Sequence, residues 1–352
     1  MNKGTEAEIK RLTQYSSSSG CGCKISPTVL SEIISKSGNW AQIDEKLLVG
    51  NSAMDDACVY QLPDGNALVS TVDFFTAIVD DPYDFGRIAA ANAISDVYAM
   101  GAKPLFANAL LGWPVDELGT DMAAKVMEGA KSICEKAGIV IAGGHSIAVK
   151  EPIFGLTVNG ICDAKNIKRN NTAEEGDLIY LTKPLGIGVL STAIKREKIS
   201  TADYKKLIEI ACDLNVLGEV LGQYKSIHAM TDVTGFGFLG HLLEMCKGSG
   251  ISAEINIQKI PLIEGVEKYI AEYVFPDNTW KNWNACESET EGVEGLEMVN
   301  LCDPQTSGGL LIAVAPSFRK EFEQIADTAN TMVYLVGRFT EMRGKKIGIV
   351  RE

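Results

Sequence analysis

Short apolar runs alternate with polar, glycine-containing breaks along most of the chain, and this pattern predicts a mixture of strands and helices. The β-branched runs at 57–62 and 66–74 are separated by a Pro-Asp-Gly sequence, which predicts a hairpin. The alanine-rich stretch at 83–101 ends in glycine and predicts a helix. Further strands are predicted at 104–113, 139–144 and 153–161, with a helix at 120–138.

A polar stretch at 165–177 interrupts this pattern and is interpreted as a linker, because a second series of strands and helices follows it. Strands are predicted at 177–183, 228–233, 251–257, 308–315, 332–339 and 345–352, and helices at 188–197, 202–224, 236–248 and 317–329. Residues 275–300 are acidic and show no regular period. The order of elements does not fit a regular doubly wound sheet, so two α+β domains with a cleft between them are predicted.

The first 47 residues are polar and rich in serine and glycine, with one short helix predicted near Ser26–Ser35. We therefore divide the chain into a flexible segment at 1–47, a first domain at 48–165 and a second domain at 166–352.

Composition and charge narrow the class of protein. Of the 352 residues, 46% are hydrophobic and 22% charged, as in soluble globular proteins. A net charge of −13 argues against a protein that binds nucleic acid by neutralising phosphates. The N-terminus lacks the apolar core of a signal peptide, and no run approaches the roughly 20 apolar residues of a membrane span, so a cytoplasmic protein without a membrane partner is expected.

Aspartates stand at the ends of several predicted elements. Asp55 and Asp56 precede the first predicted strand, Asp73 lies near the end of the second, and Asp232 ends a short one. Any one of these taken alone is more simply explained as a cap or a solvated charge. Asp96 instead interrupts an apolar helix, where a carboxylate must be paired or coordinate a cation. Carboxylates of this kind are suited to Mg²⁺ bound together with the phosphates of a nucleotide.

Two glycine motifs are candidates for phosphate binding. GFGFLG at 235–240 matches the dinucleotide fingerprint, but Asp232 would put a negative charge where the pyrophosphate binds. AGGHS at 142–146 follows a predicted strand and is either a phosphate-binding loop or an ordinary glycine turn. The chain contains no G-x-x-x-x-G-K-[ST] sequence, which excludes a Walker-type loop.

The stretch SSSSGCGCKIS at 16–26 places Cys21, Cys23 and Lys24 between small, flexible residues. A metal clip lacks partner ligands, and a disulfide between such close cysteines is strained. The remaining interpretations are a plain flexible loop, or a mobile reactive thiol whose pKa is lowered by Lys24.

Taken together, these stretches resemble the selenophosphate synthetase family, also called selenide, water dikinases. The resemblance covers nearly the whole chain and rests, in order, on RLTQYS, GCGCKISP, DDACVY, STVDFF, DPYDFGRIAAANAISDVYAMGAKP, AGGHSI, EPIFGLTVNGI, AMTDVTGFGFLGHL and CDPQTSGGLL. It implies the aminoimidazole-ribonucleotide-synthetase-like fold, with two α+β domains, a homodimer, and ATP bound at the subunit and domain interface.

The resemblance also implies a phosphotransferase with paired acceptors, which converts ATP, selenide and water to selenophosphate, AMP and orthophosphate with Mg²⁺. Such an enzyme supplies the selenium donor for selenocysteine and seleno-tRNA synthesis. Cys21 matches the reactive cysteine and Lys24 the essential lysine, while Asp56, Asp96 and Asp232 match the metal-binding aspartates. The positions that match nucleotide contacts are Lys24, Ala53, Met54, Asp55, Asp73 and Asp96, together with Gly144, His145 and Ser146 from the partner subunit.

Two features depart from the family pattern. Ser52-Ala53-Met54 stands where many relatives have Thr and Arg, and residues 275–295 have no clear counterpart. Alternative hypotheses are another kinase of the same superfamily, such as a thiamine-phosphate kinase; an NAD-dependent oxidoreductase that uses GFGFLG; and a non-catalytic selenium or metal carrier.

Overall fold

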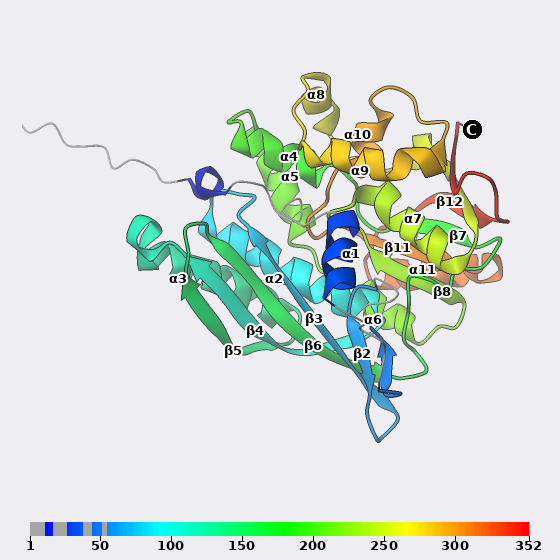
Figure 1. The fold of residues 1–352 in the computed structure, drawn as a ribbon, viewed down its shortest axis with the longest axis horizontal. Coiled ribbons are helices and arrows are strands. Elements are labelled where there is room, and N and C mark those ends of the chain that lie inside the picture. The colour runs from blue at the N-terminus through cyan, green and yellow to red at the C-terminus, as the bar shows by residue number, and fades with distance from the viewer. Residues whose placement is uncertain (1–10, 17–26, 38–43, 51–54, 352) are drawn as a thin grey trace, which may run out of the picture.

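The computed structural model describes residues 11–16, 27–37, 44–50 and 55–351. Cys21, Cys23, Lys24, Ala53 and Met54 lie outside these described residues. Two β-sheets with surrounding helices make up the described chain (Figure 1). This mixed α/β arrangement of two sheets confirms the predicted fold class.

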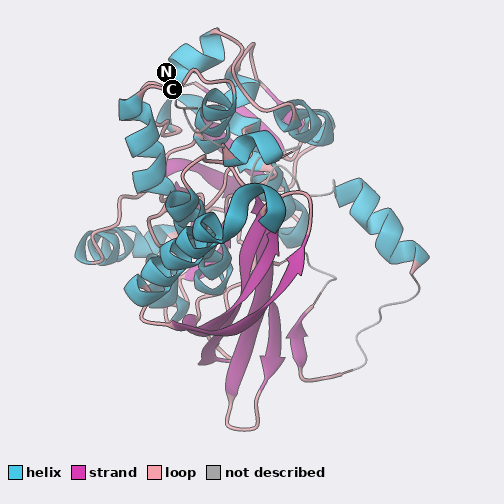
Figure 2. Cartoon of the chain, turned by 90° about the vertical axis from the view of Figure 1, so that its left-hand side faces the viewer, coloured by secondary structure: helices cyan, strands magenta, loops and turns pink. Residues whose placement is uncertain are grey.

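The first sheet has six strands in the order β1-β2-β3-β6-β4-β5. Its strands are β1 (Leu47–Val49), β2 (Cys58–Gln61), β3 (Asn66–Thr76), β4 (Lys103–Trp113), β5 (Val140–Ala148) and β6 (Ile153–Asp163). β2 and β3 pair as the predicted antiparallel hairpin, and only the β4–β5 pair of this sheet is parallel. In Figure 2 the long strands of this sheet extend below the cluster of helices.

One face of the first sheet packs on α2 (Pro82–Ala99), which in turn packs on α3 (Val115–Lys136). Alternation along β3 sends Val69 and Phe75 into this layer and leaves Val72 and Phe74 exposed on the other face. The carboxylate of Asp81 caps α2 by accepting from Tyr83 N and Asp84 N. Because α2 is buried along almost its whole length, its small residues are core positions.

The second sheet has seven strands in the order β10-β13-β9-β12-β7-β11-β8. They are β7 (Leu178–Leu181), β8 (Ile227–Asp232), β9 (Ser252–Asn256), β10 (Thr290–Glu291), β11 (Leu310–Val314), β12 (Tyr334–Thr340) and β13 (Ile347–Val350). The helices of this half are α4 (Ile187–Lys195), α5 (Thr201–Ala211), α6 (Leu217–Gly222), α7 (Gly237–Ser249), α8 (Val266–Ala271), α9 (Asn278–Cys286), α10 (Glu297–Cys302) and α11 (Arg319–Thr328). Near the N-terminus lie a short 3₁₀ helix (Leu12–Tyr15) and α1 (Pro27–Lys36), and further short 3₁₀ helices occur at Ile257–Lys259, Glu287–Glu289 and Pro316–Phe318.

The polar stretch at 165–177, interpreted as a linker, connects β6 to β7, and its buried Lys168 donates through Nζ to Tyr224 O and Ile227 O. The structure differs from the sequence interpretation at residues 275–300 and at AGGHS. Residues 275–300 are not irregular, because they contain α9 and part of α10. AGGHS is not a loop after a strand, because all five residues belong to β5.

No helix in the described ranges is long and apolar enough to cross a membrane.

The close contact between α2 and α3 predicts that a single methyl group added at Gly129 lowers the stability of the fold. A Cβ at Gly129 would lie 2.0 Å from Tyr83 O, so Gly129→Ala forces the two helices apart. We expect Gly129→Ala to lower the free energy of unfolding by about 1–3 kcal/mol in urea denaturation. Gly344→Ala is the control, since a Cβ there has no neighbour within 4 Å among the described residues. Equal stability of the two variants would contradict the close crossing.

Candidate functional site

Three carboxylates from distant parts of the chain meet where the two sheets join. Asp56 lies just before β2, Asp96 lies in α2 and Asp232 ends β8. One carboxylate oxygen from each lies within 4.8 Å of the others. Asp96 and Asp232 are buried, with exposed fractions of 8% and 1%. The structure therefore brings together the three residues predicted as metal ligands.

Hydroxyl groups hold these carboxylates in place. Thr71 Oγ1, on β3, donates to Asp96 Oδ2 at 2.5 Å. Thr231 Oγ1 donates to Asp56 Oδ1 at 2.9 Å. These neutral donors orient the carboxylates and do not themselves neutralise the negative charge.

Asp56 carries the clearest sign of a cation-binding site. Its Oδ2 atom is shielded from solvent and accepts no hydrogen bond from the described residues. Burial, and then the charges of Asp232 and Asp96, raise the pKa of Asp56 well above its usual range. A cluster of carboxylate oxygens with an unsatisfied buried atom fits a hard divalent cation, which prefers oxygen ligands.

Asp73 and Asp55 lie beside this cluster, and each accepts a hydrogen bond from an N–H group rather than from a hydroxyl. Asp73 Oδ2 accepts from Asn92 Nδ2 at 2.7 Å, which explains why a second polar residue stands on the Asp96 face of α2. Asp55 Oδ1 accepts from Asn170 N at 2.8 Å, in the stretch interpreted as a linker. Burial raises the pKa of Asp55, and the bond from Asn170 N opposes this shift.

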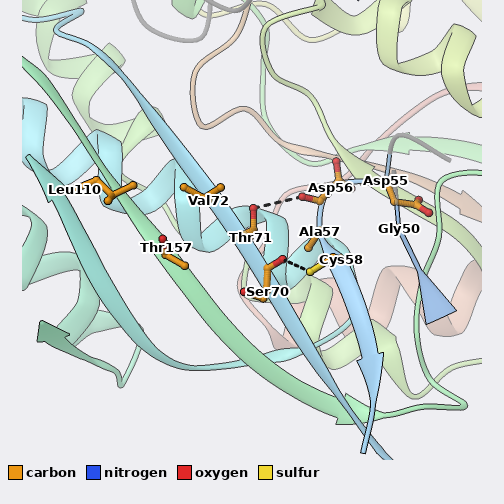
Figure 3. A pocket seen from close by; sticks show the side chains of 10 residues that line it. All are labelled: Gly50, Asp55, Asp56, Ala57, Cys58, Ser70, Thr71, Val72, Leu110 and Thr157. Atoms are coloured by element: carbon orange, nitrogen blue, oxygen red, sulfur yellow. Dashed lines mark hydrogen bonds between the residues drawn. The ribbon is translucent and has the colours of Figure 1, made fainter. Parts of the chain in front are cut away.

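A cleft of about 610 Å³ opens next to the carboxylates (Figure 3). It is lined by Gly50, Asp55, Asp56, Ala57, Cys58, Ser70, Thr71, Val72, Leu110 and Thr157. Acidic groups therefore stand at one end, and the other end runs over β3, β6 and β4 of the first sheet. A polyanionic ligand in this cleft requires cations between its own charges and the carboxylates.

Gly144, His145 and Ser146 do not meet the carboxylates within this chain. They are exposed on β5, where Gly144 pairs with Ala109 of β4. Ala109 pairs with Leu156 of β6, which pairs with Asp73 of β3. Three inter-strand steps therefore separate Gly144 from Asp73, a distance of roughly 14 Å at the usual spacing.

The sequence interpretation missed the hydroxyl donors around the carboxylates. Ser95 precedes Asp96 and Thr231 precedes Asp232, so a hydroxyl residue next to two of the three aspartates was the available signal. Adjacent side chains point in different directions, however, so each hydroxyl bonds to the carboxylate of an aspartate other than its sequence neighbour. Ser95 Oγ donates to Asp232 Oδ2 at 2.5 Å, and not to its neighbour Asp96.

Comparisons with known proteins agree on one family. The AIR synthase related protein models match residues 54–162 with the N-terminal domain and 174–350 with the C-terminal domain. The selenide, water dikinase of Pseudomonas putida is 48% identical over 98% of this chain and 100% of its own length. The enzyme of the same name from Bordetella bronchiseptica is 50% identical over 95% of this chain and 96% of its own.

Solved structures show the same fold at lower identity. Thiamine monophosphate kinase from Aquifex aeolicus superposes with a TM-score of 0.67 at 18% identity, over 92% of this chain and 98% of that one. The fold is thus common to proteins with different names, and the near-half identity to the dikinases separates this chain from the thiamine-phosphate kinase alternative.

The crowded carboxylates predict that Asp56→Asn stabilises the cation-free protein. A raised pKa in the folded state means that stability from Asp56 is present below pH 4 and is lost as pH rises through the folded-state pKa. Asp56→Asn should therefore melt about 2–4 °C above wild type at pH 8 in EDTA for each kcal/mol of repulsion removed, with a smaller gain at pH 5. Thermal unfolding by circular dichroism measures this difference.

The control is Asp327→Asn, which removes an exposed carboxylate from α11. It should leave the melting temperature unchanged at both pH values. A wild-type protein that is more stable than Asp56→Asn at pH 8 without cations would disprove the repulsion.

Proposed function

The chain belongs to the selenide, water dikinase family, and on that premise we propose that it converts ATP, selenide and water to selenophosphate, AMP and orthophosphate. The observation that carries the proposal is the meeting of Asp56, Asp96 and Asp232 beside a cleft large enough for a nucleotide. A second candidate function has no comparable support, since the carboxylates and the family membership point to the same chemistry.

The lining of the cleft supports a proposal for how ATP would lie in it. Its phosphates would lie at the end lined by Asp55 and Asp56, with Asp73 and the adjacent residues Ala53 and Met54 as further contacts. Mg²⁺, held by Asp56, Asp96 and Asp232, would neutralise the phosphate charges when bound. The unsatisfied Oδ2 of Asp56 is the atom that supports this assignment.

Cys21 and Lys24 complete the proposed chemistry. Lys24 would stabilise negative charge on the γ-phosphoryl group as selenide attacks it. The thiolate of Cys21 would bind or deliver the selenium, because it is a soft nucleophile. ADP formed in the first step would then be hydrolysed in the same site to AMP and orthophosphate.

The product distribution tests this proposal. Purified protein incubated with Mg·ATP under reducing, anaerobic conditions should release AMP only when selenide is present. Lys24→Ala should slow AMP release by about 10²–10³-fold, since it removes one cationic stabiliser of the transferring group. Nucleotides separated by ion-exchange chromatography give the rates.

Lys36→Ala is the matched control, because Lys36 is exposed on α1 and pairs only with Glu32 among the described residues. It should keep wild-type activity. ADP as the final product would favour a simple kinase, and absence of turnover by the wild type would refute the dikinase assignment.

The exposed face of the first sheet supports a homodimer. Val72, Phe74, Phe106, Val140 and Ile147 come from β3, β4 and β5, and each is at least 36% exposed. Apolar side chains gathered on one sheet face mark an interaction surface. His145 and Ile147 alternate onto the same side of β5, so a second copy that covers Ile147 also covers His145. The partner subunit would thereby contribute Gly144, His145 and Ser146 to the nucleotide site.

A charge on this sheet face should separate the subunits. We expect Val140→Glu combined with Phe74→Glu to halve the mass measured by light scattering, because two charges would be desolvated at the interface. Selenide-dependent AMP release should fall in parallel. Met342→Glu, at an exposed methionine of the second sheet's half, should change neither. A monomeric wild type, or a double variant that remains dimeric, would count against the shared site.

A further inference from the structure

One loop of the second half contacts the carboxylate site through hydrogen bonds across the domain boundary. The loop covers residues 303–309, just before β11. Ser307 N donates to Asn92 Oδ1 at 2.7 Å, and Asn92 Nδ2 donates to Asp73. A backbone amide of one half thereby orients a side chain of the other half that holds a carboxylate.

A second chain of hydrogen bonds starts at the next residue of the loop. Asn215 Nδ2 donates to Gly308 O at 2.9 Å and to Ser95 Oγ at 2.8 Å. Ser95 Oγ then donates to Asp232 Oδ2 at 2.5 Å. Asn215 lies between α5 and α6, while Ser95 lies in α2, so this chain crosses from the second half to the first and returns.

The chemistry of the groups fixes the direction of every bond in this second chain. The carbonyl of Gly308 only accepts, so the Asn215 atom that faces it is the amide nitrogen. Both protons of that nitrogen are then used, one for Gly308 O and one for Ser95 Oγ. Ser95 has a single hydroxyl proton, and it points to Asp232 because an ionised carboxylate can only accept.

The loop that anchors Asn215 is itself held firmly. Lys183 Nζ donates to Ser307 O and to Asp213 O, each at 2.8 Å. Ser307 has a left-handed backbone with φ of 56°, which is costly for a non-glycine residue and persists only where neighbours impose it. Asn215, Ser95 and Ser307 are all buried, so solvent does not compete for these bonds.

From this arrangement we infer that Asn215 is a positioning residue for divalent-cation binding, which acts through Ser95 on the carboxylate of Asp232. The inference rests on the proposed function, since it takes Asp232 as a ligand. Without the amide proton, the Ser95 hydroxyl is less firmly oriented, and its bond to Asp232 Oδ2 no longer fixes that oxygen. Groups that orient ligands from behind in this way commonly change metal affinity by 10–100-fold.

The test is a double-mutant cycle on cation affinity, without nucleotide or selenide. Mn²⁺ serves as the probe, and electron paramagnetic resonance of free Mn²⁺ gives the dissociation constant of the full chain. Asn215→Leu and Ser95→Ala should each weaken binding by roughly tenfold. The double variant should bind no more weakly than Ser95→Ala alone, because Asn215 acts only through the hydroxyl.

Asn256→Leu is the control for the loss of a buried asparagine, since Asn215 and Asn256 are equally exposed at 5%. Asn256→Leu should lower the melting temperature about as much as Asn215→Leu does, but it should keep the wild-type affinity for Mn²⁺. If Asn215→Leu does not fold, Asn215→Ala replaces it in the cycle.

Two results would overturn the inference while leaving the metal site intact: wild-type affinity in Asn215→Leu, or additive losses in the double variant. A wild-type chain that does not bind Mn²⁺ would instead overturn the metal site itself, and the inference with it.

Discussion

The close approach of three carboxylates at the junction of two sheets is the constraint on which the rest of the site depends. Asp56, Asp96 and Asp232 come from elements separated by up to 176 residues, and their oxygens lie within 4.8 Å of one another. Like charges so close and so buried repel strongly, so the surrounding fold must hold them together. Helix α2 meets this demand, because it is buried almost throughout and packs between the first sheet and the second half of the chain.

The groups that hold the carboxylates are suited to a site that must remain charged. Thr71, Thr231 and Ser95 each supply one hydroxyl proton, which fixes the orientation of an oxygen without cancelling its charge. A lysine or arginine in the same places would neutralise the site and compete with a cation for it. The cost is a buried oxygen on Asp56 that accepts no hydrogen bond within the described part of the chain, an example of stability given up at a functional site.

Local features of the fold could be predicted from the sequence because local chemistry specifies them. The β2–β3 hairpin follows from two alternating strands around Pro63 and Gly65, and the end of α2 follows from Gly101. The failures have physical causes. The glycines of AGGHS suggested a turn, but pairing with β4 keeps them extended. The acidic composition of residues 275–300 concealed α9, whose buried residues are only Thr279 and Cys286, and α10, which at six residues is too short to show a helical period.

The convergence of the aspartates could not be derived from spacing, because it depends on how two sheets pack, and only the resemblance to a family predicted it. The hydroxyl donors illustrate the same limit. Ser95 is adjacent to Asp96 but bonds to Asp232, because successive residues of a helix point about 100° apart and a strand from the other half approaches Ser95. A site assembled across a domain boundary is thus specified by tertiary contacts. Any shift between the two halves moves Asp232 relative to Asp56 and Asp96, so the bonds of Asn215 and of the loop at 303–309 across this boundary bear on the site, although neither was a candidate by residue type.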